Sequence, residues 1–153
     1  MCLILDLFLD FSDVDNKLAD ICVRDVLEKT FKVLRFRTLT LDVKLSALVA
    51  GEGDYTFRDK NKSLLVLSLY LLLNEIITLC SQVDLFLEEE SGKRRELTLT
   101  SRPSSNGVKF LFKNLDEHLD LRGIDNINFI SGILYINSLK FTLYKNGFEV
   151  IER

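Results

Sequence analysis

The chain has 153 residues, which predicts one domain, and its 47% hydrophobic content is enough to build a core. A net charge of −3, with both signs interspersed, argues against a broad nucleic-acid-binding surface. The three cysteines form no CxxC pair, so we expect neither a zinc site nor a disulfide framework. This cysteine usage fits a reducing, cytoplasmic setting.

The N-terminal segment, residues 1–14, has apolar residues at helical spacing and is expected to be a helix. It resembles a signal peptide only superficially, because Asp6 and Asp10 interrupt it and no basic residues precede them. Its apolar stripe would be exposed on an isolated helix, so it is a candidate contact for a homodimer or a partner.

Helical spacing and alternation predict the elements of the first half, from residue 15 onwards. We expect a helix over 21–36, a half-buried strand over 39–45 and a turn-rich loop over 51–61. A long helix follows over about 62–80 and is apolar nearly all round, which is typical of a buried helix. It is slightly short for a membrane span, and Asn74 and Glu75 would be costly in lipid, so no membrane contact is predicted.

The second half predicts hairpins followed by a last helix. Strand signals occupy 83–88, 96–101 and 107–112, and a helix is expected over 126–144 before a closing strand. Hairpin strands with helices between them predict an α+β fold, a two-layer sandwich with one face of a mixed sheet covered by helices.

Several stretches resemble the histidine kinase ATP-binding domain, the GHKL or Bergerat fold. LILDLFLDFSDVDN looks like the end of a kinase dimerisation hairpin, which divides the chain into a helical segment, 1–14, and an ATPase-like domain, 15–153. VRDVLEKTFKVLRFRTLTLDVKL looks like the first helix and strand of that domain, and YLLLNEI looks like its asparagine box. The resemblance puts Asn74 on the magnesium-binding asparagine and Tyr70 on its companion.

The glycine boxes of that family are missing. FLFKNLDEHL stands where a DxGxG sequence is expected, and the second glycine-rich box is reduced to Ser131-Gly132. Glycines there let the backbone approach a nucleotide. The pattern resembles ChpT-type histidine phosphotransferases, whose ATPase-like domain no longer binds ATP. The resemblance therefore implies a degenerate domain with no cofactor and no metal.

Two residues are candidates for chemistry. His118 is the single histidine and a candidate phosphoacceptor, with Arg122 one helical turn on to meet a phosphoryl group. A surface histidine in an acidic turn is the alternative. Asn74 is a candidate nucleotide-binding residue, and the alternative is a buried amide satisfied by the backbone. No catalytic set is visible around a lone histidine.

The sequence therefore predicts a bacterial two-component phosphorelay protein that docks the receiver domain of a response regulator, with no nucleic acid or membrane partner. One alternative is a divergent histidine kinase or ATPase that still binds ATP through Asn74. Another is a purely structural α+β interaction protein. A nucleotide pocket filled by Phe129 or Tyr135 would favour a binding module over an enzyme.

Overall fold

The structure is a computed structural model that describes residues 18–41, 43–49, 55–84, 95–115 and 119–153. The helices are α2 (Val23–Thr40), α3 (Lys62–Asp84) and α4 (Ile127–Ile136), with a short 3-10 helix, η2, at Leu121–Gly123. The strands are β1 (Ala19–Cys22), β2 (Val43–Val49), β3 (Thr56–Lys60), β4 (Arg95–Ser104), β5 (Gly107–Lys113), β6 (Leu139–Tyr144) and β7 (Gly147–Glu152).

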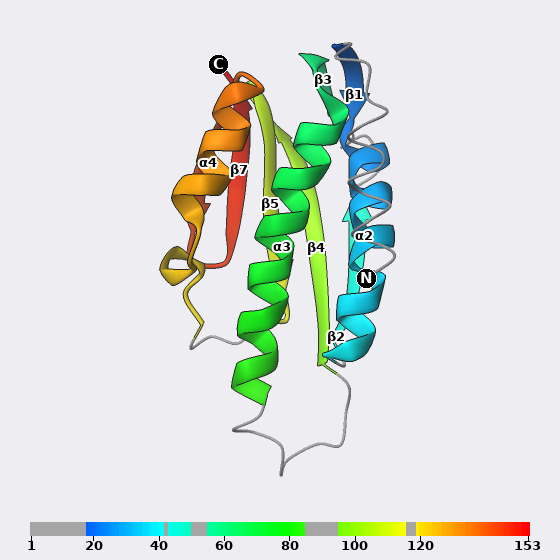
Figure 1. Ribbon diagram of the computed structural model, residues 1–153, viewed down its shortest axis with the longest axis vertical. Helices are drawn as coiled ribbons and strands as arrows, with labels where there is room; N and C mark the ends of the chain where they lie inside the picture. The colour runs from blue at the N-terminus through cyan, green and yellow to red at the C-terminus, as the bar shows by residue number, and fades with distance from the viewer. Residues whose placement is uncertain (1–17, 42, 50–54, 85–94, 116–118) are drawn as a thin grey trace.

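The main sheet has five strands in the order β2-β4-β5-β7-β6. β2 runs parallel to β4, and every other neighbouring pair is antiparallel. β1 and β3 form a separate two-stranded antiparallel sheet. Figure 1 shows α2, α3 and α4 on one side of the main sheet. This arrangement is the two-layer α+β sandwich that the sequence predicts.

The helices form where apolar residues recur at helical spacing. α2 buries one stripe that includes Val23, Val26, Leu27 and Leu34. α3 is buried along most of its length because it packs against α2, α4 and the sheet. Asn61 begins α3 as an N-cap, since its side-chain oxygen accepts a hydrogen bond from the Leu64 amide at 3.1 Å.

The length and composition of α3 over Lys62–Gln82 would also suit a membrane span, and it is the one such helix among the described residues. Most of this stretch is buried inside the fold. Its apolar side chains are therefore already covered by protein, as in the core helix of an α+β domain.

An aromatic cluster fills the space between the sheet and the helices. The ring of Phe148 on β7 stacks on Phe110 of β5 with 4.7 Å between centroids, and Phe112 and Phe141 lie beside it. β7 lies close against β5 at Gly147, where an added Cβ would clash with the carbonyl oxygen of Phe110. Glycine is therefore required where β7 begins.

Five predicted elements differ from the structure. The helix predicted over 21–36 is α2 at Val23–Thr40, because residues 21 and 22 belong to β1. The strand predicted over 83–88 is wrong where it can be compared, because residues 83 and 84 are the last turn of α3 and residues 85–88 lie outside the described part. The strand predicted over 39–45 begins later, at Val43, because α2 continues to Thr40.

The other two differences are strands, β3 and β6, that the hydrophobic pattern of the sequence did not predict. The loop predicted over 51–61 contains β3, and the helix predicted over 126–144 ends at Ile136 and gives way to β6. Ser138 adopts the left-handed conformation, with φ of 57°, and stops the helix where glycine is the usual signal.

The hydroxyl of Ser101 is buried on the inner face of β4, without a hydrogen-bond partner among the described residues. A buried polar group without a partner costs about 1–3 kcal/mol. We expect Ser101→Ala to raise the free energy of unfolding by about 1 kcal/mol, as measured by urea denaturation. The control is Ser46→Ala, because Ser46 is exposed; an equal gain in both variants, or a loss in Ser101→Ala, would contradict the expectation.

Candidate functional site

One row of α3 side chains faces α2 and includes the candidate Asn74. Tyr70, Asn74 and Thr78 are spaced four residues apart, which places them on one side of the helix. Arg37, in the last turn of α2, reaches this row. Its Nε donates to Oδ1 of Asn74 at 3.0 Å, and an Nη donates to Oγ1 of Thr78 at 2.9 Å. Arg37 thus binds the amide oxygen that the resemblance assigns to magnesium.

Tyr70 occupies the position that the resemblance gives to a second asparagine, and its side chain is buried. Burial raises the pKa of the phenol, and the nearby positive charge of Arg37 lowers it to a smaller extent. A neutral, buried phenol offers no anionic ligand to a metal ion. The row therefore presents one amide, one phenol and one hydroxyl to a guanidinium.

This arrangement does not fit a magnesium–nucleotide complex at Asn74. Magnesium prefers oxygen ligands in octahedral geometry, and it is repelled by a fixed positive charge. The Asn74 oxygen already accepts a charge-assisted hydrogen bond, so a metal ion there would have to displace Arg37. Among the described residues, no three His, Cys, Asp or Glu side chains cluster as a metal site would require.

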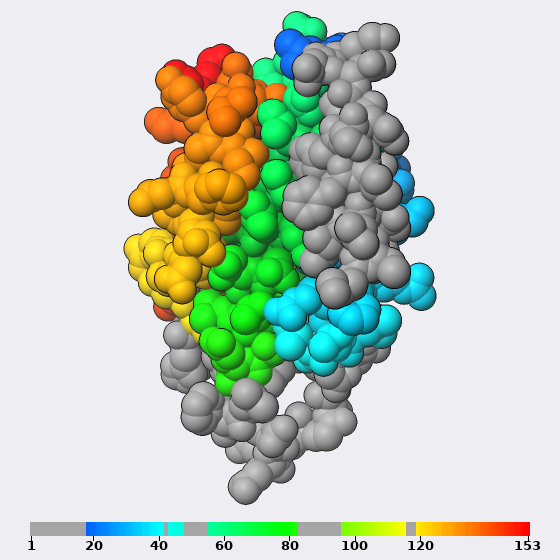
Figure 2. Space-filling model, viewed as in Figure 1, coloured from blue at the N-terminus to red at the C-terminus, as the bar shows by residue number. Residues whose placement is uncertain are grey.

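Glu75, the next residue, faces α4 instead of α2. Its carboxylate accepts a hydrogen bond from the side-chain amide of Asn126 at 2.9 Å, at the residue that precedes α4. Figure 2 shows α3 and α4 side by side on this face of the molecule. Glu75 therefore joins the two helices across their boundary.

The remaining features of α4 do not form a nucleotide loop. Ser131 and Gly132 lie in the middle of the helix, with open space around Gly132. Phe129 and Tyr135 do not fill a pocket, because 64% and 61% of their surfaces are exposed. Tyr135 instead lies under the guanidinium of Arg153, at 3.9 Å from the ring centroid.

The candidate phosphoacceptor His118 lies outside the described residues, as do Asp116 and Glu117. Its predicted partner Arg122 is described, and it sits in η2 after two non-helical residues. Because residues 119 and 120 are not helical, the described part of this segment does not show the helix on which the predicted pairing of Arg122 with His118 relied, and the role of His118 stays a prediction. Arg122 forms an ion pair with Asp120 at 2.6 Å, and its hydrogen bonds hold the pKa of that exposed carboxyl near 2.

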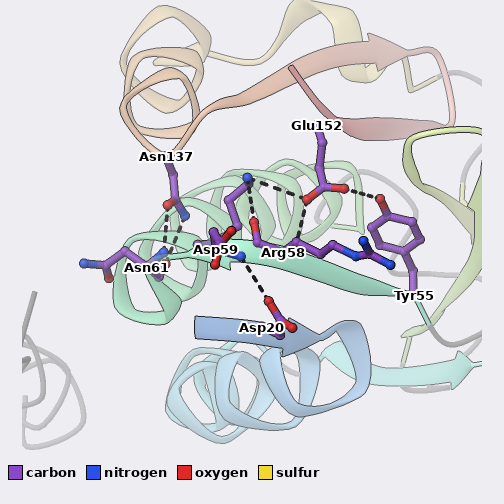
Figure 3. A network of polar contacts seen from close by, with 8 residues as sticks. Asp20, Tyr55, Arg58, Asp59, Asn61, Asn137 and Glu152 are labelled. Carbon is purple, nitrogen blue, oxygen red and sulfur yellow. Dashed lines mark hydrogen bonds and ion pairs between the residues drawn. The ribbon is translucent and has the colours of Figure 1, made fainter. Parts of the chain in front are cut away.

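A second polar cluster, which the sequence did not reveal, joins β3 to the last strand (Figure 3). Glu152 accepts hydrogen bonds from the Tyr55 hydroxyl and from the Arg58 backbone amide, at 2.5 and 2.8 Å. Lys60, which is only 8% exposed, lies 3.6 Å from the same carboxylate. We call Tyr55, Lys60 and Glu152 the β3–β7 clamp.

The clamp shifts the pKa values of its members. Burial, and then the hydrogen bond to Glu152, raise the pKa of Tyr55 to about 12. Burial works against the charge of Glu152, but the hydrogen bonds from Tyr55 and Arg58 and the charge of Lys60 outweigh it, so its pKa lies below the usual value. At neutral pH the phenol is therefore a donor and the carboxylate an acceptor.

Asn137 extends this polar contact to the start of α3. Its side chain accepts from the Asn61 amide at 2.8 Å and donates to the Asn61 carbonyl at 2.9 Å. A side-chain amide thus satisfies both backbone groups of Asn61, as a neighbouring strand would. The turn between α4 and β6 is tied to the N-terminus of α3 through this pair (Figure 3).

Sequence reasoning placed Asn74 on the long helix correctly and missed its partner. Arg37 follows Leu34 by three residues, which continues the buried stripe of α2. Because the helix was predicted to end at residue 36, Arg37 was not recognised as part of that stripe. A cation at a core position was the available signal, because such a group needs a polar partner on the neighbouring element.

We expect Arg37→Ala to lower the free energy of unfolding by about 1 kcal/mol, since it removes two hydrogen bonds from a half-buried cation. Urea denaturation of Arg37→Ala, Asn74→Ala and the double variant should give a coupling energy of about 0.5–1 kcal/mol. Arg35→Ala, on the exposed side of α2, is the control. Strictly additive effects of Arg37→Ala and Asn74→Ala would show that the contact contributes nothing.

The order of the strands and the position of the helices identify the class of fold. A five-stranded mixed sheet with three helices on one face, accompanied by a small two-stranded sheet, is the fold of histidine kinase catalytic domains. The nucleotide-free catalytic domain of histidine kinase ThkA matches 88% of this chain and 92% of its own, with 10% identity and a TM-score of 0.53.

Two further solved structures are similar with lower scores. The cytoplasmic segment of histidine kinase QseC matches 98% of this chain and 90% of its own, at 12% identity and a TM-score of 0.48. ThkA in complex with the response regulator protein TrrA matches 97% of this chain and 45% of its own, at 11% identity and a TM-score of 0.43. No family model and no curated protein matches the sequence.

Proposed function

We propose that this chain is a degenerate histidine-kinase-type ATPase-like domain that works by docking a protein partner in two-component signalling, in the manner of ChpT-type phosphotransferases. The observation that carries the proposal is the hydrogen bond from Arg37 to the side-chain oxygen of Asn74. In a domain that binds magnesium and ATP, this oxygen has to be available to the metal ion.

The sequence around the site supports the same proposal. Residues 110–119, where the resemblance expects glycines, contain none. Gly132 is inside α4 and has an ordinary helical backbone, so it forms no phosphate-binding loop. Without glycines in this segment, the backbone lacks the close approach that usually lets its amides hold the phosphates of a nucleotide.

The proposed partner is the receiver domain of a response regulator in a cytoplasmic phosphorelay. ThkA, whose catalytic domain shares this fold, has been solved in complex with the response regulator TrrA. In this proposal the chain supplies a binding surface and no catalysis. Residues 1–14, which lie outside the described part, are the proposed contact for a homodimer or for the partner.

Calorimetric titration of the purified chain with magnesium and ATP tests the proposal. We expect no heat of binding from the wild type, and none from Asn74→Ala. Binding at micromolar to millimolar affinity that Asn74→Ala abolishes would overturn the degenerate reading and restore a nucleotide-binding enzyme. The second arm titrates isolated receiver domains from the same organism, and we expect one of them to bind without ATP; if none binds, the docking role is wrong.

A further inference from the structure

The face of the main sheet that points away from the helices is exposed and rich in positive charge. In β5, Val108, Phe110 and Phe112 are buried toward the helices, so the alternate residues Lys109, Leu111 and Lys113 point to the other side. Figure 1 shows no described element over that side. We call it the outer sheet face.

The register of the strands places five cations and two carboxylates on the outer sheet face, in a chain with a net charge of −3. The cations are Lys44, Arg102, Lys109, Lys113 and Lys140, and the carboxylates are Glu96 and Glu149. Both carboxylates already have partners on this face. Glu96 lies 3.5 Å from Lys44, and Glu149 accepts from the Tyr144 hydroxyl at 3.2 Å.

The centre of this face contains a like-charge pair that the fold does not need. Arg102 on β4 and Lys109 on β5 are directly opposite each other in the ladder. Like charges in this position destabilise a sheet by a few tenths of a kcal/mol, up to about 1 kcal/mol. Lys109 lies over the ring of Tyr144, at 4.8 Å from its centroid, on the side away from β4. Neither Arg102 nor Lys113 has an ion pair with any described carboxylate.

We propose that the outer sheet face binds an extended acidic segment of a partner protein, with Arg102 and Lys113 as the main contacts. Lys113 is opposite Thr98, four residues from Arg102, so the two cations are separated by about 13 Å along the strands. An extended segment with acidic residues about four positions apart matches this spacing. This surface is distinct from the helical face that carries Arg37 and Asn74.

The composition of the face favours a protein over other anionic partners. Tyr144 is its one aromatic ring among the described residues, and Lys109 covers it, so the face offers no stacking platform for bases. Leu111 and Ile151, the large apolar residues of this face, are half-buried, whereas residues that insert into a membrane expose their apolar side chains. A small apolar centre with a polar, solvent-accessible rim is the arrangement of protein–protein interfaces.

The test is a fluorescence-anisotropy and NMR titration with a labelled peptide whose glutamates are spaced about four residues apart. The peptide with glutamine at each glutamate is its control. The double variant Arg102→Ala/Lys113→Ala is compared with Lys32→Ala/Arg35→Ala, which removes the same charge from exposed positions of α2. Circular dichroism and thermal melting confirm that both variants fold.

We expect the acidic peptide to bind and to shift the amide signals of Thr100, Leu111 and Ile151 on the outer sheet face. Arg102→Ala/Lys113→Ala should weaken binding about tenfold, the combined effect of two exposed charge contacts, and the α2 variant should leave it unchanged. Equal weakening in both variants, shifts confined to the helices, or no binding would overturn the proposal. Preferential binding of duplex DNA or of phosphatidylserine vesicles through Arg102 and Lys113 would also overturn it.

Discussion

Replacing Phe148 by alanine is expected to lower the free energy of unfolding by about 3–5 kcal/mol, which is enough to unfold a marginal domain of this size. The Phe148 ring is fully buried, and it touches three other aromatic rings between the sheet and the helices. Its removal loses the free energy gained by burying the ring. It also leaves a cavity, because the close-packed neighbours relax only partly into the space. Urea denaturation followed by circular dichroism measures the loss.

Phe129→Ala is the matched control for that experiment. The same substitution on the exposed side of α4 should change stability by less than about 0.5 kcal/mol, apart from the gain in helix propensity. Phe148→Leu should recover part of the loss, because it keeps most of the buried volume. A Phe148→Ala variant as stable as Phe129→Ala would show that the aromatic cluster is not the core of the sandwich.

Glu152→Gln is expected to lower the free energy of unfolding by about 2 kcal/mol, because Lys60 would remain buried without its counter-ion. Glutamine keeps the size of the side chain and can still accept a hydrogen bond from Tyr55 or Arg58, so the variant tests the charge. Glu96→Gln is the control, since its ion pair with Lys44 is exposed and should contribute less than about 0.5 kcal/mol.

The contribution of Glu152 should also depend on pH. Its pKa in the folded protein lies below the usual 4.5, so the folded state favours the charged form. The stabilisation is therefore complete above the pKa of the unfolded chain and is lost as the pH falls through the lower, folded value. The free energies of unfolding of wild type and Glu152→Gln should therefore converge as the pH falls below the folded-state pKa of Glu152. A difference that stays constant throughout the acid range would exclude the charge as its source.

The spacing of apolar residues predicted those helices and strands whose buried side follows from their own sequence. α2, α3, β4 and β5 each repeat apolar residues at the spacing of their own geometry, and their positions follow from it. β3 has the sequence TFRDK, with one apolar residue, and its buried Lys60 has its counter-ion, Glu152, on a distant strand. The sequence near β3 cannot indicate that Glu152, more than ninety residues further along the chain, will bond to Tyr55 and Arg58.

The end of α4 shows a different limit. LKFTLY alternates as a strand does, but it follows an apolar helix without glycine or proline between them. Ser138 adopts the left-handed conformation that separates the helix from the strand. The side chain of the preceding residue, Asn137, forms two hydrogen bonds with the backbone of Asn61. The candidate site was limited by a helix boundary instead. Asn74 followed from the long helix, whereas Arg37 was missed because α2 was predicted to end at residue 36.

The position of β7 inside the sheet has a consequence for synthesis on the ribosome. β7 pairs with β5 on one side and β6 on the other, although it follows both in the chain. A nascent chain that ends before residue 147 can pair β2, β4 and β5, but β5 then presents an open edge and the Phe110 ring lacks Phe148. Translational pausing in this region would therefore prolong a state that chaperones recognise and that neighbouring chains can join.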